Sequence, residues 1–142
     1  MYKIMGVVLA VPLGGCLTAA KEAPVAPPLA TSELRDLAPA EKALLAKALA
    51  KTLKDPESAK FEWTKIAKPL SPTSVVYYCA ALNAKNSYGG YVGAAPFMAA
   101  VNFDGGKITG ASMDMLASAN VVERDIVVKR CGQLGLDPFS TG

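Results

Sequence analysis

The chain has 142 residues, enough for one small domain but not for two separate hydrophobic cores. Lys and Arg total 15 and Asp and Glu total 12, so the net charge of +3 lacks the clustered basic excess of a nucleic-acid binder. Histidine is absent, which removes the commonest general base and the commonest metal ligand. Three cysteines leave an odd number to be explained.

The first fifteen residues have the pattern of a signal peptide. Lys3 precedes an apolar run over residues 4–13, which as a helix would cover about half of a bilayer core. The run ends in Leu-Gly-Gly-Cys at residues 13–16, which resembles the lipobox of bacterial lipoproteins. The resemblance implies cleavage after Gly15 and a lipid on Cys16. The alternatives are a secretory signal cleaved after Ala20 and an uncleaved anchor.

The resemblance to lipoproteins also implies a location. Two or more acyl chains hold a protein durably on a membrane. Leu17 stands where members of that family retained at the inner membrane tend to carry Asp, which favours the outer membrane, with the protein facing the periplasm. Residues 16–38 are rich in Ala and Pro and predict an extended tether. Residues 39–142 then form a single small domain.

The domain is predicted to be α+β. Pro39 suits the first turn of a helix over residues 39–54, which Asp55-Pro56 would stop. Alternating or dense apolar residues predict strands over 60–67, 74–82, 96–103 and 107–113. Asn120 caps a last helix, with Glu123 completing a capping box and Gly132 or Gly135 ending it. The expected order is α-β-β-β-β-α, an antiparallel sheet of about four strands packed by an N-terminal and a C-terminal helix.

The last helix is expected to turn a broad apolar stripe toward the core. The residues of that stripe are Val122, Ile126, Val127, Cys131 and Leu134.

Cys79 and Cys131 remain once Cys16 carries the lipid. In an oxidising compartment they predict one disulfide, which would hold the last helix on the sheet. The alternatives are two buried free thiols, or redox chemistry, for which no Cys-x-x-Cys or histidine is present.

The segment over residues 83–93 is the candidate binding loop. Its amide, tyrosine and glycine residues suit either a ligand contact or a structural loop whose side chains pack back on the sheet. It lacks the Gly-Lys-Ser/Thr end of a phosphate loop. The candidate site residues are Asn83, Lys85, Asn86, Tyr88, Gly89, Gly90 and Tyr91.

Two segments of the chain resemble a family of small bacterial envelope proteins. Residues 53–61 read LKDPESAKF, and residues 83–93 read NAKNSYGGYVG after a strand that carries Cys79. This is similar to the family's pattern of DPxSAxF, a Cys strand and VNAKNxxGGYxG, with Leu82 in place of the commoner Val. The family has no established activity, so the resemblance implies an envelope location and no mechanism.

The expected function is that of a membrane-anchored, non-enzymatic structural or protein-interaction module of the bacterial envelope. The alternative is a module that binds a small ligand, peptidoglycan or another glycan through residues 83–93. The acids Asp104, Asp114, Glu123 and Asp125 show no paired spacing for acid–base work, and no metal or other cofactor is expected. The expected partners are the membrane, through the lipid, and another envelope protein or peptidoglycan, but no nucleic acid.

Overall fold

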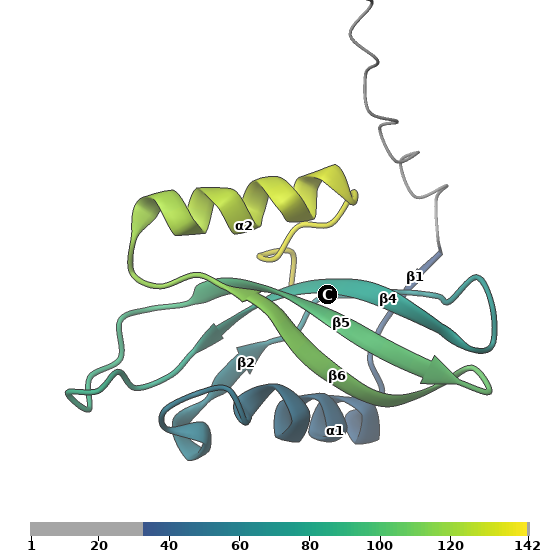
Figure 1. Cartoon of the computed structure of the whole chain (residues 1–142), viewed down its shortest axis with the longest axis horizontal. Coiled ribbons are helices and arrows are strands. Elements are labelled where there is room, and N and C mark those ends of the chain that lie inside the picture. Colours follow the sequence, from purple (N-terminus) through teal and green to yellow (C-terminus); the bar gives the residue numbers. More distant parts are fainter. Residues whose placement is uncertain (1–32, 142) are drawn as a thin grey trace, which may run out of the picture.

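The computed structural model describes residues 33–141 (Figure 1). The predicted signal peptide, Cys16 and most of the predicted tether lie outside the described residues. The elements, in chain order, are β1 (Leu34–Arg35), α1 (Pro39–Ala50), the 3-10 turn η1 (Pro56–Ser58), β2 (Lys60–Glu62), β3 (Ile66–Ala67), β4 (Ser74–Asn83), β5 (Ala95–Asp104), β6 (Lys107–Leu116) and α2 (Val121–Gln133). Within the described residues, neither α1 nor α2 is long and apolar enough to cross a bilayer.

The predicted α+β class is confirmed. Four antiparallel strands form a sheet in the order β2-β4-β5-β6, and β1 pairs with β3 in a separate two-stranded sheet. The helices α1 and α2 lie on opposite faces of the larger sheet (Figure 1). The central strands β4 and β5 pair over nearly their whole length, from Ser74 opposite Phe103 to Leu82 opposite Ala95.

The single strand predicted over residues 60–67 is wrong. It is divided into β2 and β3, which belong to different sheets. Thr64 lies between them, where its backbone N–H donates to the hydroxyl of Tyr78 and its side chain donates to the carbonyl of Cys79. These bonds replace the ladder bonds of a continuous strand. Phe61 and Trp63 nevertheless share one side, as the alternation predicts, and their rings stack at 4.8 Å between centroids.

Ordered packing begins upstream of the predicted boundary at Pro39. Strand β1 lies within the predicted tether, and Leu37 is buried in the core beside α1. The guanidinium of Arg35 binds both carboxylate oxygens of Glu41 at 2.7 Å, and Glu41 also accepts the N–H of Ala38 at the start of the helix. The observed order therefore differs from the expected α-β-β-β-β-α in two ways: β1 precedes α1, and the first predicted strand is divided into β2 and β3.

Helix α1 is shorter than predicted. It ends at Ala50, and residues 51–54 continue in turns in which the N–H groups of Thr52 and Leu53 bond three residues back rather than four. Asp55 itself is non-helical, with φ of −127°, as expected of the residue before a proline. Leu45 and Leu49 are fully buried against the sheet.

Helix α2 carries a narrower buried stripe than predicted. Val127 and Cys131 are buried and Leu134 packs beside them, but the side chains of Val122 and Ile126 are 64% and 46% exposed. A helix resting on one sheet buries only residues close to the line of contact, so positions farther round its circumference stay in solvent. The predicted inward orientation of Val122 and Ile126 is therefore wrong.

The ends of α2 follow the sequence more closely. The Asn120 side chain caps the helix by accepting the N–H of Val122, and Gly135 follows the helix with φ of 70°. The expected capping box is not formed, because Glu123 reaches past Asn120 to accept the N–H of Ser118. Hydrogen bonding to the Ser118 side chain, and then to its backbone N–H, lowers the pKa of the Glu123 carboxyl. The predicted disulfide is confirmed, since Cys79 of β4 is bonded to Cys131 of α2.

Candidate functional site

The loop between β4 and β5 is folded back on itself. The side chain of Asn86 accepts the backbone N–H groups of Tyr88 and Gly90 at 2.9 and 3.1 Å, and Asn86 and Gly90 also bond through their backbones. Gly89 has φ of 80°, a left-handed conformation that other residues adopt only with strain. The residues of NAKNSYGG thus encode a tight turn with its own hydrogen bonds, rather than an open coil.

The loop is also fastened to η1. The hydroxyl of Ser58, which is buried, accepts the N–H of Lys85 at 2.9 Å, and the Ser58 carbonyl accepts the hydroxyl of Tyr91 at 3.1 Å. Lys54, just before η1, donates from Nζ to the Ser87 hydroxyl at 2.8 Å. The two segments quoted for the envelope-family resemblance, 53–61 and 83–93, are therefore direct partners in the fold.

The two tyrosines of the loop have different surroundings. Tyr91 is 42% exposed, its hydroxyl is bonded to Ser58, and Lys60 Nζ lies 4.7 Å from the centre of its ring. Tyr88 is 96% exposed. Tyr91 thus packs back on the fold, as the structural alternative predicts, while Tyr88 projects into solvent.

The remaining predicted residues are divided in the same way. The side-chain oxygen of Asn83 is buried, with no hydrogen-bond partner among residues 33–141. Lys85 is exposed, with Nζ 6.0 Å from the centre of the Tyr91 ring. The structure brings Lys85, Asn86 and Tyr88 to the surface of the loop and leaves Asn83 at the end of β4.

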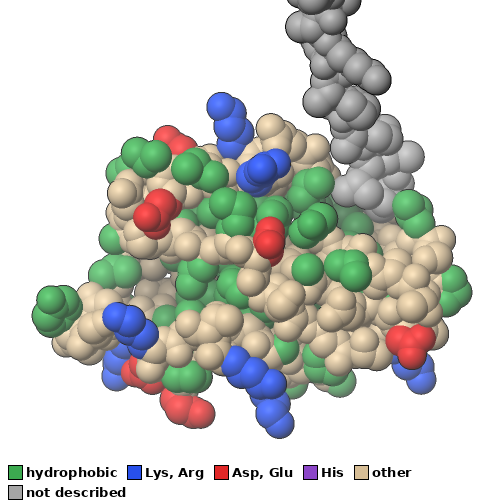
Figure 2. All heavy atoms as spheres, in the orientation of Figure 1, with side chains coloured by type: hydrophobic (Ala, Val, Ile, Leu, Met, Phe, Trp, Pro, Cys, Tyr) green, Lys and Arg blue, Asp and Glu red, His purple; other side chains and the backbone are tan. Residues whose placement is uncertain are grey.

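A cleft of about 410 Å³ opens beside the loop. It lies where the turns after α1, the loop, and the connection from β6 to α2 converge, and Figure 2 shows a hollow with apolar side chains at its floor between α2 and the loop end of the sheet. The residues that line it are Thr52, Leu53, Lys54, Leu82, Ala84, Lys85, Asn86, Ser87, Val92, Gly93, Ala95, Leu116, Ala117, Ser118, Ala119 and Arg124.

Sequence reasoning identified only the loop side of this cleft. The other walls come from segments about 30 residues away on either side, and no spacing in the sequence joins them. Arg124 is partly buried and donates from Nη1 to the Ala94 carbonyl at 2.7 Å, which fastens α2 to the end of the loop. A cation close to the N-terminus of a helix is unfavourable next to the helix dipole. In the sequence, this unfavourable position is the feature that could have indicated a tertiary partner for Arg124.

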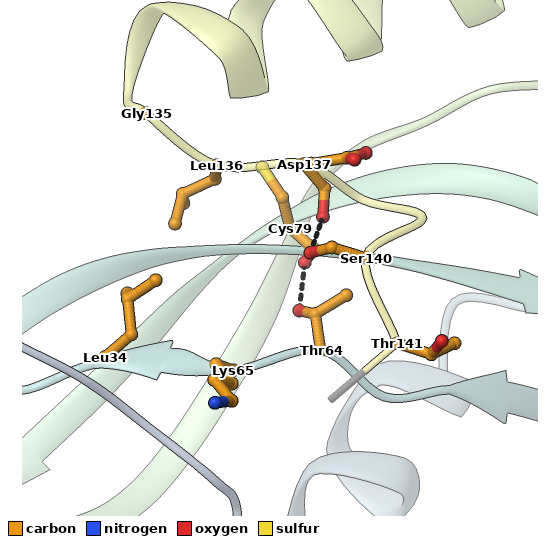
Figure 3. Close-up of a pocket in the computed structure, with 9 residues that line it drawn as sticks. All are labelled: Leu34, Thr64, Lys65, Cys79, Gly135, Leu136, Asp137, Ser140 and Thr141. Atoms are coloured by element: carbon orange, nitrogen blue, oxygen red, sulfur yellow. Dashed lines mark hydrogen bonds between the residues drawn. The ribbon is translucent and has the colours of Figure 1, made fainter.

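A second cavity of about 200 Å³ lies beside the disulfide (Figure 3). The hydroxyl of Thr64 donates to the Cys79 carbonyl, and the hydroxyl of Ser140 donates to the Asp137 carbonyl. Both hydroxyls therefore already have partners within the protein. The arrangement fits a structural junction between the C-terminal segment and the sheet better than a ligand site.

The acidic residues considered for catalysis are spread over the fold. Asp104 accepts the Thr73 hydroxyl at 3.1 Å beside the turn between β5 and β6, and Glu123 serves at the start of α2. Among residues 33–141, no group of three or more His, Cys, Asp or Glu is arranged to hold a metal ion. Comparisons of the chain with protein-family models, curated proteins and solved structures found no match.

Proposed function

We propose that this chain is a lipid-anchored protein of the bacterial envelope that acts, without catalysis, as a protein-interaction module. Its contact point is the loop tip at Tyr88, and its anchor is Cys16. The observation that carries the proposal is the exposure of Tyr88 on a loop whose backbone is fixed by Asn86 and Ser58.

A fixed loop favours binding because its ordering entropy is lost on folding rather than on association. Tyrosine is enriched at protein interfaces, since its ring is apolar and its hydroxyl is polar. A tyrosine almost wholly in solvent on a rigid loop is therefore suited to enter a pocket on a partner.

The position of the loop supports the same function. Figure 1 places the loop between β4 and β5 at the end of the molecule away from β1, the first described strand. A tether that enters the fold at β1 would hold the domain with Tyr88 directed away from the anchored end. The loop would then be free to meet a partner across the periplasmic space.

Glycan binding through both tyrosines receives less support. The hydroxyl of Tyr91 is bonded to Ser58, and Lys60 occupies one face of its ring. A sugar that stacked on that face would have to displace the lysine, so only the ring of Tyr88 is freely available. This geometry favours a single aromatic contact with a protein over a two-ring platform for peptidoglycan.

Site-specific crosslinking in cells tests the partner. A photoreactive residue at position 88 is expected to give a discrete adduct with one envelope protein, and Tyr88→Ala should abolish co-purification of that protein without lowering the melting temperature. Tyr77, an exposed tyrosine that lies on β4 rather than in the loop, is the matched control position. Identical adducts at both positions, no adduct at position 88, or sedimentation with sacculi that depends on Tyr88 would contradict the proposal.

Cell fractionation tests the anchor. Cys16→Ser is expected to remove the protein from the outer-membrane fraction. Mass spectrometry of the wild type should show acyl groups on Cys16. A wild-type chain that begins after Ala20 without a lipid would contradict this part of the proposal.

A further inference from the structure

The cleft beside the loop has the size and walls of a small-ligand site. Its volume of about 410 Å³ lies in the lower part of the range of roughly 300–1,000 Å³ usual for such sites. Leucines from three separate segments contribute to it: Leu53 after α1, Leu82 of β4 and Leu116 of β6. Apolar surface held open at the meeting of three segments is covered favourably by an apolar ligand.

The walls are aliphatic rather than aromatic. In the part of the chain that the structure describes, no Phe, Tyr or Trp lines the cleft, so these residues offer no flat ring for a sugar or a base to stack on. Two of its polar side chains are already used, because Asn86 accepts N–H groups of its own turn and Ser87 accepts from Lys54. The interior is therefore suited to a flexible hydrocarbon chain and poorly suited to a polyhydroxylated ring.

The charged side chains of the described residues that line the cleft are all positive. Lys54, Lys85 and Arg124 line it, and no Asp or Glu among residues 33–141 does. Asp55, Glu123 and Asp125 adjoin Lys54 or Arg124 in the sequence without lining the cleft, and the Glu123 carboxylate accepts the N–H of Ser118. Because acidic and basic residues are nearly equal in number over the chain as a whole, three cations around one apolar cleft are a local asymmetry.

From this geometry we infer that the cleft binds a single-chain fatty acid. The hydrocarbon chain lies along Leu53, Leu82 and Leu116, and the carboxylate meets the cations at the rim. Arg124 uses Nη1 for the Ala94 carbonyl and keeps further N–H donors for a carboxylate. This inference goes beyond the protein-interaction function and does not depend on it, because Tyr88 does not line the cleft.

Calorimetric titration of the purified full chain tests the inference. The chain carries Cys16→Ser, so that no acyl group is attached there, and is kept free of detergent. Decanoate, below its micellar concentration, is expected to bind in a 1:1 ratio. Decyltrimethylammonium, with an opposite charge, and butyrate, with a short chain, are each expected to bind at least about tenfold more weakly. Added salt should weaken decanoate binding, since exposed charges are screened.

Variants locate the site. Lys85→Gln combined with Arg124→Gln is expected to weaken decanoate binding about tenfold, the loss of about one charge-assisted hydrogen bond. Lys107→Gln, an exposed lysine at the turn between β5 and β6, is the matched control and should change nothing. Ala119→Trp is expected to fill the cleft and block binding at an unchanged melting temperature, which separates loss of the site from loss of the fold.

Several results would overturn the inference. Equal binding of decanoate and decyltrimethylammonium would show that charge does not select the ligand, and equal binding of butyrate would show that the apolar walls do not contribute. Decanoate binding that survives Ala119→Trp would lie elsewhere on the chain. Decanoate affinity that falls as the protein is concentrated would show that a second copy of the chain occupies the cleft.

Discussion

The two faces of the four-stranded sheet are covered by helices of similar length, 12 residues in α1 and 13 in α2, but they are held in different ways. On the α1 face, Leu45 and Leu49 enter a core in which twelve of the described residues are buried, including Tyr78 and Phe97. On the α2 face, the described core has five buried residues, two of which are Cys79 and Cys131.

The difference shows how a small domain can be stabilised on two faces by two kinds of interaction. Burial of large apolar side chains holds α1, because each fully buried leucine contributes about 2–3 kcal/mol. Helix α2 buries little, and four of its aliphatic residues remain exposed. The disulfide to β4 supplies the stabilisation that apolar burial supplies for α1. The exposed surface of α2 is therefore not needed to hold the helix on the sheet.

Removal of the disulfide is expected to have the largest effect. Cys79→Ala combined with Cys131→Ala should lower the free energy of unfolding by about 4 kcal/mol in the chain-entropy model for a separation of 52 residues. Chemical denaturation measures this loss. Hydrogen exchange should rise first in α2 and leave α1 protected, because only α2 depends on the bond.

Chemical reduction provides the control for the disulfide variant. Reduction should destabilise the wild type by the same amount and leave the double variant unchanged. Equal acceleration of exchange in α1 and α2 would contradict the division between the two faces.

Truncation of a core leucine tests the α1 face. Leu49→Ala is expected to cost about 3 kcal/mol, within the range of roughly 2–5 kcal/mol for buried leucines, because it removes a fully buried side chain and leaves a cavity. Leu70→Ala is the matched control, since Leu70 is 81% exposed and its truncation should change stability by less than about 0.5 kcal/mol. A similar loss in both variants would argue against a core centred on α1.

A single hydroxyl tests the junction at which the predicted strand divides. Tyr78→Phe is expected to cost about 1–3 kcal/mol, because the buried N–H of Thr64 loses its acceptor. Burial also raises the pKa of the Tyr78 hydroxyl above its ordinary value of 10.0, so its ionisation in an alkaline titration followed by absorbance should be delayed beyond that pH. Tyr77→Phe, at the exposed neighbouring position, should leave stability unchanged, and an equal loss in both variants would contradict this role.

The parts of the fold that could be predicted from sequence are those determined by local pattern. The long strands β4, β5 and β6 follow dense or alternating apolar residues, and the predicted pairing of Cys79 with Cys131 is confirmed. The parts that were missed depend on distant partners. Strand β1 has two residues and no pattern of its own, and the break at Thr64 is caused by Tyr78, fourteen residues later.

In the candidate site, too, the features set by local sequence could be predicted and those set by distant partners could not. The turn around Asn86 and Gly89 depends on adjacent residues, so its position could be predicted. The different roles of Tyr88 and Tyr91 could not, because they depend on Ser58, which lies about 30 residues earlier. The cleft could not be predicted either, since Lys54, Lys85 and Arg124 meet only when the sheet and both helices are in place.

The smallest predicted effect concerns the ion pair that joins β1 to the start of α1. Hydrogen bonds from Arg35, and then the N–H of Ala38, lower the pKa of the Glu41 carboxyl below its ordinary value of 4.5. Glu41→Gln is expected to cost about 1 kcal/mol at pH 7, a modest figure because the pair is partly screened by solvent. Glu33, whose pair with Lys68 is exposed, is the matched control, and Glu33→Gln should have no measurable effect.

The pH dependence of the Glu41→Gln effect follows from the direction of the pKa shift. A carboxyl whose pKa is lower in the folded state stabilises the fold at pH values above its unfolded pKa, and this contribution is lost as the pH falls through the folded value. The difference in unfolding free energy between wild type and Glu41→Gln should therefore be constant from pH 7 to about pH 5.5 and should shrink below about pH 4.5. A difference that persists undiminished in acid would assign the effect to packing against α1 rather than to the charge. The contact between β1 and α1 would then be stabilised by apolar burial, like the rest of the α1 face.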